Sequence, residues 1–321
     1  MKGLTLVLIG NRFDRGVFLK AGQHPDFHFE QASQLSELSK HYPDAQALIV
    51  RSGTTIDSDL LDKLPKLKLV VTATAGFDHI DLMACEKKGV KCFHTPHAQK
   101  VAAAEMTILL MLASLRKLPQ AFNQIQRGDW NRSLLLGEQL FGKTLGIIGL
   151  GRVGTEVAKR AYALGLKVTA YDPHITEAPE FVTMMGFEEM MRSLDILSIH
   201  VPKTGRTRHM IKKETLSWLH SEALLVNMSR GDVINEDDLI DHLMENPESR
   251  AALDVFAREP LSTDSPLMKL NNVVMSPHVG ASTQGAIQES SQQAMDCVFT
   301  FFNGGEPGAE ALPPKAPWWG E

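Results

Sequence analysis

A glycine-rich turn between a strand and a helix constrains this chain more than any other feature. Gly149, Gly151 and Gly154 form GLGRVG directly after the strand-like run TLGII and open a segment whose apolar residues recur at helical spacing. The first glycine permits a tight turn, the second lets backbone N–H groups approach a pyrophosphate, and the third lets helix and strand pack closely. Because a helix N-terminus attracts anions, this pattern predicts a dinucleotide-binding unit that also includes Arg152 and Val153.

An acidic residue after the next strand indicates which dinucleotide binds. The run KVTAY ends before Asp172, about 20 residues beyond the glycines, where a carboxylate accepts hydrogen bonds from ribose hydroxyls. The same carboxylate would repel a 2′-phosphate, and no arginine follows within the next several residues to bind one. We therefore predict NAD as the cofactor rather than NADP.

Length and composition limit the remaining possibilities. The 321 residues correspond to about two domains, and 43% apolar with 22% charged residues is typical of an ordinary globular protein. A formal net charge of -5 offers no general attraction to nucleic acid or to an anionic membrane, so we expect neither as a partner. Three scattered cysteines, Cys85, Cys92 and Cys297, form neither a disulfide framework nor a four-ligand zinc site, which predicts no metal and a reducing compartment.

Two apolar stretches must be distinguished from secretion and membrane signals. Residues 4–10 read LTLVLIG and run into polar sequence without a small-residue cleavage site, so we expect a core strand rather than a signal peptide. Residues 101–118 contain Glu105 and Arg116 and are shorter than the ~20 apolar residues that span a bilayer. This segment predicts a buried helix, ended by Pro119, in a cytoplasmic protein.

Short β-branched runs alternate with helical segments, a pattern typical of parallel sheets flanked by helices. The first series comprises residues 4–9, 47–50, 69–72 and 91–94. The second comprises six runs, at residues 144–149, 167–171, 195–200, 223–228, 252–256 and 272–277. We predict an α/β protein with two Rossmann-like or flavodoxin-like domains, helical connections at 101–118 and 283–302, and an extended tail whose Trp318 and Trp319 dock on the chain.

Three short segments carry the residues expected to perform the chemistry. NMSRG contains Arg230, DVFAREP contains Asp254 and Glu259, and SPHVG contains His278. Each follows a predicted strand of the second series, at the edge where doubly wound sheets bind ligands. Taken singly, they are consistent with a surface cation, loop acids and a packed histidine, but together they indicate an acid–base site.

The ordered motifs resemble those of the D-isomer-specific 2-hydroxyacid dehydrogenases over most of the chain, from about residue 4 to residue 303. The motifs are VRSGT, TAGFDHID, HTPHAQKVAAAE, GLGRVG, YDP, HVP, NMSRG, ALDVFAREP and SPHVG. The resemblance implies a discontinuous substrate domain of residues 1–97 plus 286–321, an NAD-binding Rossmann domain of residues 98–285, and a catalytic cleft between them. It also implies a homodimer built through the cofactor domain.

The resemblance implies hydride transfer between NAD and a small D-2-hydroxy acid or its 2-oxo acid. A planar guanidinium at Arg230 suits a substrate carboxylate and polarises the ketone oxygen. An imidazole at His278 has a suitable pKa to exchange a proton with that oxygen, and Glu259 would orient the imidazole and stabilise its charged form. Asp254 would contact the nicotinamide carboxamide.

The resemblance also implies further binding residues. For the cofactor these are the glycine motif, Asp172, His200, Val201, Pro202, Thr207, Met228, Ser229, Arg230, Asp254, His278 and Gly280. For the substrate they are Arg51, Ser52, Ala75, Gly76, Gln99, Arg230 and His278. The turn Ala75–Gly76 is similar to the family's backbone N–H cradle for the substrate carboxylate. Gln99 stands where many members have Asn, which leaves the identity of the substrate open.

The motif layout is most similar to the phosphoglycerate dehydrogenase branch, in a short form without a regulatory domain. That similarity implies 3-phosphohydroxypyruvate as substrate and a place in serine biosynthesis. Arg51, His97 and Lys100 would supply positive charge for the phosphate, although lysines and histidines in loops are more often simply solvated. A hydroxypyruvate or glyoxylate reductase is the alternative. A different class also remains, because the corepressors called C-terminal-binding proteins share the fold and the Arg, Glu and His set but act mainly as NAD-sensing binding modules. Turnover with a 2-oxo acid distinguishes the two classes.

Overall fold

The computed structural model describes residues 3–10 and 12–313, which form two compact units. The first unit comprises the chain up to Lys100 together with the stretch that begins at Ala281, and the second runs from Val101 to Gly280. The tail residues Trp318 and Trp319, for which we predicted docking, lie outside the described residues.

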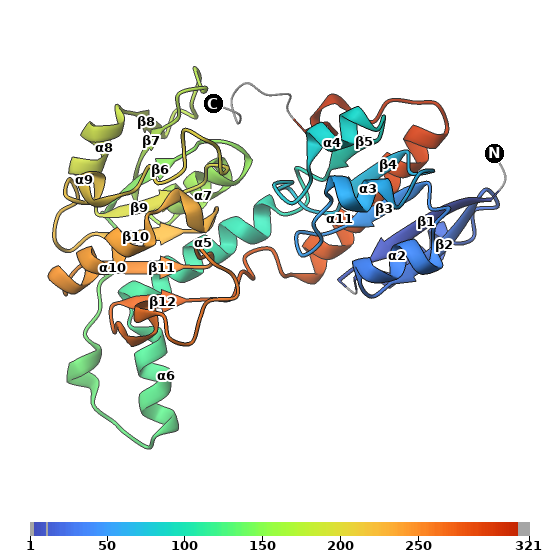
Figure 1. The fold of residues 1–321 in the computed structure, drawn as a ribbon. Coiled ribbons are helices and arrows are strands. Elements are labelled where there is room, and N and C mark those ends of the chain that lie inside the picture. Colours follow the sequence, from blue (N-terminus) through green and yellow to red (C-terminus); the bar gives the residue numbers. More distant parts are fainter. Residues whose placement is uncertain (1–2, 11, 314–321) are drawn as a thin grey trace. The chain divides into compact units, whose positions relative to one another are not determined.

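The first unit is built on a five-stranded parallel sheet in the order β2-β1-β3-β4-β5, which is the flavodoxin-like order (Figure 1). Its strands are β1 (Leu4–Ile9), β2 (Phe27–Ala32), β3 (Ala47–Val50), β4 (Leu69–Thr72) and β5 (Lys91–His94). Four of them lie where the sequence predicted strands. The prediction missed β2, an edge strand that pairs only with β1.

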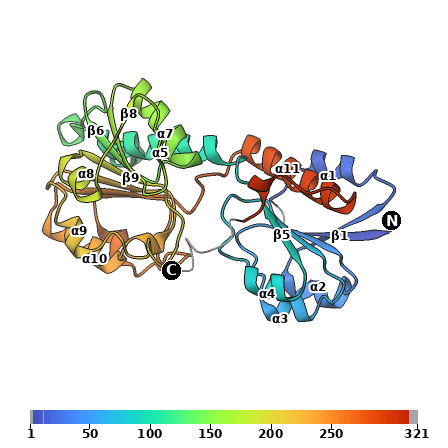
Figure 2. The ribbon, with the colours of Figure 1, turned by 90° about the horizontal axis from the view of Figure 1, so that it is seen from above.

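Helices cover both faces of this sheet. They are α1 (Arg15–Ala21), α2 (Leu35–His41), α3 (Ser58–Asp62), α4 (Leu82–Lys87) and α11 (Gln284–Phe302), and a short 3₁₀ turn, η4 (Ala309–Ala311), follows. Figure 2 shows α1 and α11 on one face and α2, α3 and α4 on the other. The core under α11 joins both ends of the sequence, because Ala294 and Val298 pack there with Leu6, Ile49 and Val71.

The second unit is built on a seven-stranded parallel sheet in the order β12-β11-β10-β9-β6-β7-β8. Its strands are β6 (Thr144–Ile148), β7 (Lys167–Tyr171), β8 (Val182–Met184), β9 (Ile196–Ile199), β10 (Leu224–Asn227), β11 (Arg250–Leu253) and β12 (Val273–Met275). The predicted number of six strands was wrong, because the three-residue β8 adds an edge strand beside β7. After β6 the chain adds β7 and β8 on one side of the sheet and then returns to add β9 on the other side of β6. Sheets of this kind bind a dinucleotide at such a switch point in the strand order.

Two apolar cores lie on the two faces of this sheet. One contains buried residues of α5 (Lys100–Leu115) and α7 (Arg152–Ala163), and the other contains those of α8 (Phe187–Ser193), α9 (Lys213–Leu216) and α10 (Glu236–Glu245). The remaining elements are α6 (Leu118–Gln126) and the 3₁₀ turns η1 (Arg132–Leu135), η2 (Gly231–Val233) and η3 (Pro266–Lys269). In the described part of the chain, no helix is long and apolar enough to cross a membrane.

The long helix predicted for residues 101–118 is in fact interrupted. Helix α5 ends at Leu115, and Lys117 adopts a left-handed backbone with φ of 51°. Pro119 does not end a helix but lies in the first turn of α6, where the N–H that proline lacks has no helical partner to lose. The prediction of a stop at Pro119 was therefore wrong.

Candidate active site

The predicted site residues of the second unit follow the carboxyl ends of its parallel strands. The glycine turn follows β6, Asp172 follows β7, His200–Pro202 follow β9, Met228–Arg230 follow β10, Asp254 follows β11 and His278 follows β12. Because all strands of the sheet run parallel, these residues gather at one edge. The structure thus collects residues spread over more than a hundred positions of sequence.

The glycine turn is shaped by contacts that admit no side chain. Gly149 has φ of 89°, and a Cβ there would lie 2.7 Å from the carbonyl oxygen of His200. A Cβ at Gly154 would overlap the carbonyl oxygen of Gly149, so the start of α7 can pack this closely only with glycine. Gly151, at the N-cap of α7, has open space where a Cβ would lie. The turn therefore fits a bound pyrophosphate at the N-terminus of α7.

Asp172 connects the end of β7 to the glycine turn. Its Oδ2 accepts a hydrogen bond from the N–H of Leu150 at 2.9 Å, and its Oδ1 accepts one from the N–H of His174 at 2.9 Å. The carboxylate predicted to bind the ribose is thereby fixed beside the turn predicted to bind the pyrophosphate. The residues predicted for the two parts of a dinucleotide site are therefore neighbours in the structure.

The loop after β9 is compact and carries an uncharged histidine. Thr207 Oγ1 donates to the carbonyl of Pro202 at 2.6 Å, which closes the loop on itself. Burial lowers the pKa of His200 to about 3, and one of its ring nitrogens lies 2.8 Å from Ser198 Oγ. His200 is therefore neutral at physiological pH, and its ring is held against the end of β9.

A histidine–carboxylate pair lies at the centre of the predicted catalytic set. His278 Nδ1 and Glu259 Oε2 are 2.7 Å apart, and Glu259 Oε1 accepts the N–H of Phe256 at 3.1 Å. The hydrogen bond to Glu259 raises the pKa of His278, against burial and the charge of Arg230, which lower it. Burial alone would raise the pKa of Glu259, but His278, the Phe256 N–H and Arg230 together hold that pKa below its usual value.

Arg230 is carried by a loop that a buried amide side chain holds in shape. Asn227, which is 1% exposed, donates from Nδ2 to the carbonyl of Arg230 at 3.0 Å and accepts the N–H of Ser229 at 3.0 Å. A Cβ at the next residue, Gly231, would overlap the carbonyl group of Phe256. The loops that carry Arg230 and Glu259 are therefore in direct backbone contact.

Asp254 organises the loop that presents His278. Its Oδ1 accepts from Ser276 Oγ at 2.6 Å and from the N–H of Val279 at 2.9 Å, and its Oδ2 accepts from the N–H of Gly280 at 2.8 Å. The side chain is nearly fully buried, at 1% exposed. In this structure the carboxylate thus positions the backbone on both sides of His278, a role that we did not predict.

The predicted substrate residues of the first unit also share one sheet edge. Arg51 and Ser52 follow β3, Ala75 and Gly76 follow β4, and Gln99 follows β5. Arg51 Nη1 donates to Ser290 Oγ of α11 at 3.3 Å, and burial together with the charge of Arg12 lowers the pKa of Arg51. Gln99 reaches the turn after β4, where its Oε1 accepts the N–H of Ala75 at 3.2 Å.

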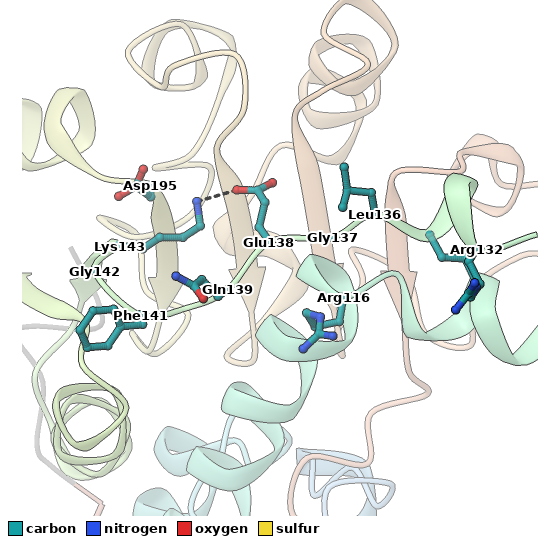
Figure 3. A pocket seen from close by; sticks show the side chains of 11 residues that line it. Arg116, Arg132, Leu136, Gly137, Glu138, Gln139, Phe141, Gly142, Lys143 and Asp195 are labelled. Atoms are coloured by element: carbon teal, nitrogen blue, oxygen red, sulfur yellow. Dashed lines mark ion pairs between the residues drawn. The ribbon is translucent and has the colours of Figure 1, made fainter.

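An open pocket of about 920 Å³ lies at a different place in the second unit. Figure 3 shows its lining, which includes Arg116, Phe141 and an ion pair between Glu138 and Lys143. Lys143 and Asp195 directly precede β6 and β9, so the pocket adjoins the amino ends of these strands. The residues predicted for catalysis and cofactor binding lie at the opposite edge, and none of them lines this pocket.

Comparison with known families agrees with this arrangement. The sequence profile described as "D-isomer specific 2-hydroxyacid dehydrogenase, NAD binding domain" matches residues 108–280, more than half of the chain. The chain belongs to the D-isomer-specific 2-hydroxyacid dehydrogenases. The matched part of the chain is the family's NAD-binding domain, and its glycine turn and Asp172 fit that cofactor.

Relatives of this chain carry different substrate names. D-3-phosphoglycerate dehydrogenase of Methanocaldococcus jannaschii is 43% identical over 78% of this chain and 48% of its own length, so the chain spans about half of that relative. Hydroxypyruvate reductase of Thermotoga maritima is 37% identical over 82% of this chain and 87% of its own length. The crystal structure of D-lactate dehydrogenase from Aquifex aeolicus, complexed with NAD and lactic acid, superposes with a TM-score of 0.82 at 27% identity. That likeness covers 93% of this chain and 96% of the other.

Proposed function

We propose that this protein is an NAD-dependent oxidoreductase that interconverts a small D-2-hydroxy acid and its 2-oxo acid. The observation that carries the proposal is the hydrogen-bonded pair of His278 and Glu259, because the loop that carries Glu259 is also in backbone contact with the loop of Arg230. Such a pair supplies a positioned proton donor, and the arginine supplies a positive charge where oxygen charge develops. Bound NAD supplies the hydride chemistry.

The residues of the chain divide the remaining work. Because Glu259 holds Nδ1 of His278, Nε2 is the ring nitrogen that gives a proton to the substrate oxygen in reduction and removes it in oxidation. Glu259 stays ionised, since its pKa is held low, and stabilises the imidazolium. The guanidinium of Arg230 binds the substrate carboxylate and polarises the ketone oxygen. In the first unit, the backbone N–H groups of Ala75 and Gly76 are proposed to bind a substrate carboxylate.

We propose 3-phosphohydroxypyruvate, reached from D-3-phosphoglycerate, as the substrate pair, which would place the enzyme in serine biosynthesis. Support comes from Arg51, a half-buried guanidinium that pairs with no carboxylate among the described residues and bonds only the hydroxyl of Ser290. The nearby charge of Arg12 makes this part of the first unit still more favourable for an anion. Reduction of hydroxypyruvate or glyoxylate is the second candidate, supported by the Thermotoga relative's name.

The test is the initial rate of NADH oxidation with 3-phosphohydroxypyruvate and hydroxypyruvate, compared at equal concentration and low salt for the wild type and for Arg51→Gln. We expect faster turnover of the phosphorylated acid, and we expect Arg51→Gln to reduce kcat/KM for that acid about tenfold more than for hydroxypyruvate. Equal losses of kcat/KM on both acids would show that Arg51 does not bind the phosphate. Absence of turnover with any 2-oxo acid, with tight NADH binding retained, would instead favour an NAD-sensing binding protein.

We also propose that the protein is a homodimer formed through the second unit. Helix α6 has no buried residue, and Leu118, Phe122 and Ile125 on one of its faces are 53%, 62% and 59% exposed. Trp130, just beyond it, is 79% exposed. Figure 1 shows α6 and η1 extending away from the seven-stranded sheet. An apolar helix face of this kind is stable in water when a partner covers it, and a second copy of the chain is the proposed partner.

The three cysteines support a reducing compartment. Cys85, Cys92 and Cys297 are all buried free thiols. Because disulfides form and persist in oxidising compartments, we propose that the protein works in the cytoplasm.

A further inference from the structure

The turn after β4 is held rigidly by its carbonyl groups. His94 Nδ1 lies 2.8 Å from the carbonyl oxygen of Ala75 and must donate, because a carbonyl only accepts. Thr74 Oγ1 donates to the carbonyl of Gly76 at 2.6 Å, and its own hydroxyl is 2.6 Å from that of Thr72. With both carbonyls bound by side chains, the orientation of the peptide groups in this turn is fixed.

The two N–H groups of the same turn are not equivalent. The Ala75 N–H donates to Gln99 Oε1 at 3.2 Å, whereas the Gly76 N–H makes no hydrogen bond to any residue in 3–10 or 12–313. Both residues are only half-buried. Two neighbouring N–H groups form a concavity that binds anions, and here the oxygen of a neutral side-chain amide occupies half of it.

The other contacts of Gln99 do not explain this position. Its Nε2 reaches the carbonyl of Ala73 only at 3.5 Å, at the limit of a hydrogen bond. The bond to Ala75 is therefore the stronger one, and it places an sp² oxygen where an oxygen of a bound carboxylate would lie. A carboxylate forms the stronger, charge-assisted bond to the same N–H and is able to displace the amide.

We propose that Gln99 is an intramolecular competitor for the carboxylate site, so that the substrate binds by displacing its side chain from the Ala75 N–H. This inference rests on the proposed function of the turn in binding a 2-oxo acid. Gln99 thereby weakens, by the same factor, the binding of every ligand that must displace it from the Ala75 N–H. Only a ligand that forms a stronger bond to this N–H, as a carboxylate does, regains what the displacement costs. Gln99 is therefore a specificity-determining residue. It raises KM, whereas a residue that contacts the substrate directly lowers KM.

The sign of the effect on KM tests the proposal. In Gln99→Ala the Ala75 N–H is free, so we expect KM for 3-phosphohydroxypyruvate and for hydroxypyruvate to fall about two- to tenfold, with kcat unchanged. In Gln99→Glu a carboxylate of the same length binds the N–H more tightly, and we expect KM to rise about tenfold or more. A higher KM in Gln99→Ala would show that Gln99 contacts the substrate directly and would overturn the proposal.

A matched control and a turnover-independent probe complete the experiment. Gln46 Oε1 accepts the N–H of Thr5 at 2.6 Å at the other edge of the same sheet, so Gln46→Ala removes a bond of the same kind and should leave KM unchanged. Oxalate binding, measured by calorimetry on the NADH-loaded protein, should tighten in Gln99→Ala and weaken in Gln99→Glu. If the wild type turns over no 2-oxo acid but oxalate follows this pattern, the proposed function fails and the competitor role stands. Unchanged or undetectable oxalate binding in all variants would overturn the competitor role.

Discussion

The imidazole of His278, the proposed proton donor and acceptor, has a pKa that is set by opposing neighbours. The Glu259 hydrogen bond raises the pKa of His278, burial and Arg230 lower it, and the charge of Asp254 raises it again. The net effect is a raised pKa, so His278 keeps its proton to a higher pH than a free histidine. In the proposed reaction, reduction needs the charged imidazole and therefore persists to a higher pH than it would with an unperturbed histidine. Oxidation needs the neutral imidazole and therefore begins only at a correspondingly higher pH.

Glu259→Gln should show this in the pH profile. The amide carries no charge, so the pKa of His278 falls and kcat/KM for reduction begins to decline at a lower pH than in the wild type. We also expect kcat to fall roughly 10²-fold, because the imidazolium loses its stabilising partner. Steady-state rates in both directions across the pH range measure the shift. If kcat/KM for reduction declines at the same alkaline pH in Glu259→Gln as in the wild type, Glu259 does not set the pKa of His278.

The same pair makes the free energy of unfolding depend on pH in a defined window. The pKa of His278 is raised by folding, so its contribution is complete below the unfolded value of ~6.5 and is lost as pH rises through the folded pKa. The pKa of Glu259 is lowered by folding, so its contribution is present above ~4.3 and is lost as pH falls through the folded pKa. Both side chains are more than a third exposed, at 42% and 36%, so the effect stays below about 1 kcal/mol.

Chemical denaturation of the wild type and of Glu259→Gln at several pH values tests this window. The stability difference between the two proteins should be largest between about pH 4.3 and 6.5 and should shrink on either side. A difference that does not vary with pH would mean that the two groups are not coupled.

Asp254→Asn tests the residue that holds the catalytic loop. One amide oxygen cannot accept all the bonds from Ser276, Val279 and Gly280, and the new NH₂ group would face a backbone donor. We expect a loss of about 1–3 kcal/mol in the free energy of unfolding and a lower kcat, measured by denaturation and steady-state kinetics. Asp129→Asn, at an exposed position whose side chain makes no hydrogen bond in the described structure, is the isosteric control and should change stability by less than about 0.5 kcal/mol.

The candidate catalytic residues were predictable because each lies within a motif. Buried polar residues that hold a loop in shape were not, because only their burial reveals them. Arg230, Glu259 and His278 stood out because each followed a predicted strand in a recognisable segment. Asn227 and His94 did not, although each is a polar residue that ends a buried strand. From the sequence, such a residue is equally consistent with a simple strand cap, and only the structure reveals which backbone group it binds.

At the scale of elements, the close approach of two loops positions the acid–base set. The loop after β10 meets the loop after β11 at Gly231 and Phe256, where backbone packs on backbone. A second link is the bond from the Ala257 N–H to Glu236 Oε2 in α10, at 3.0 Å. Arg230 and Glu259 therefore keep a fixed separation as long as these loops stay in contact.

Gly231→Ala should separate the two loops. The added methyl group overlaps the carbonyl of Phe256, so the backbone must shift, at a cost of about 1–3 kcal/mol. We expect kcat/KM to fall together with stability, as measured by steady-state kinetics and denaturation. Gly285→Ala is the control, because a Cβ there meets open space in helix α11 and alanine favours a helix. Wild-type kinetics in Gly231→Ala would show that the loop contact does not position the site.

The sequence did not predict two edge strands, β2 and β8, because neither has the apolar run that is typical of a central strand. Strand β2 reads FHFEQA, with only its two end residues buried, so it lacks the apolar run of a central strand. Strand β8 has three residues and forms by pairing with β7. The predicted strand 252–256 is observed two residues earlier, as β11, because Asp254 already belongs to the loop that holds His278.

At the scale of the whole molecule, both sheets are parallel and each gathers its polar residues at the carboxyl edge. This part of the fold was predictable, because strand-sized apolar runs separated by helices permit few other topologies. The exposed face of α6 was not, since its apolar spacing is equally typical of a helix packed on its own core. The proposed dimer accounts for that exposure.

Phe122→Glu with Ile125→Glu tests the dimer. Two charges on the apolar face of α6 should shift the protein from dimer to monomer in sedimentation equilibrium, because charged side chains are costly to bury in an interface. Asn123→Glu adds a charge to the same helix away from that face and should leave the dimer intact. A wild-type protein that sediments as a monomer at micromolar concentration would refute the assembly.

The contribution of α11 to the core of the first unit has a consequence for the order in which the protein folds during synthesis. Strands β1 to β5 leave the ribosome first, but Ala294 and Val298, which complete their core, follow only after the entire second unit has been made. The described part of the second unit is continuous in sequence and can close as soon as it emerges. The N-terminal sheet must wait with the part of its apolar face that α1 does not cover still exposed. The nascent chain is thus most prone to aggregation before α11 is synthesised.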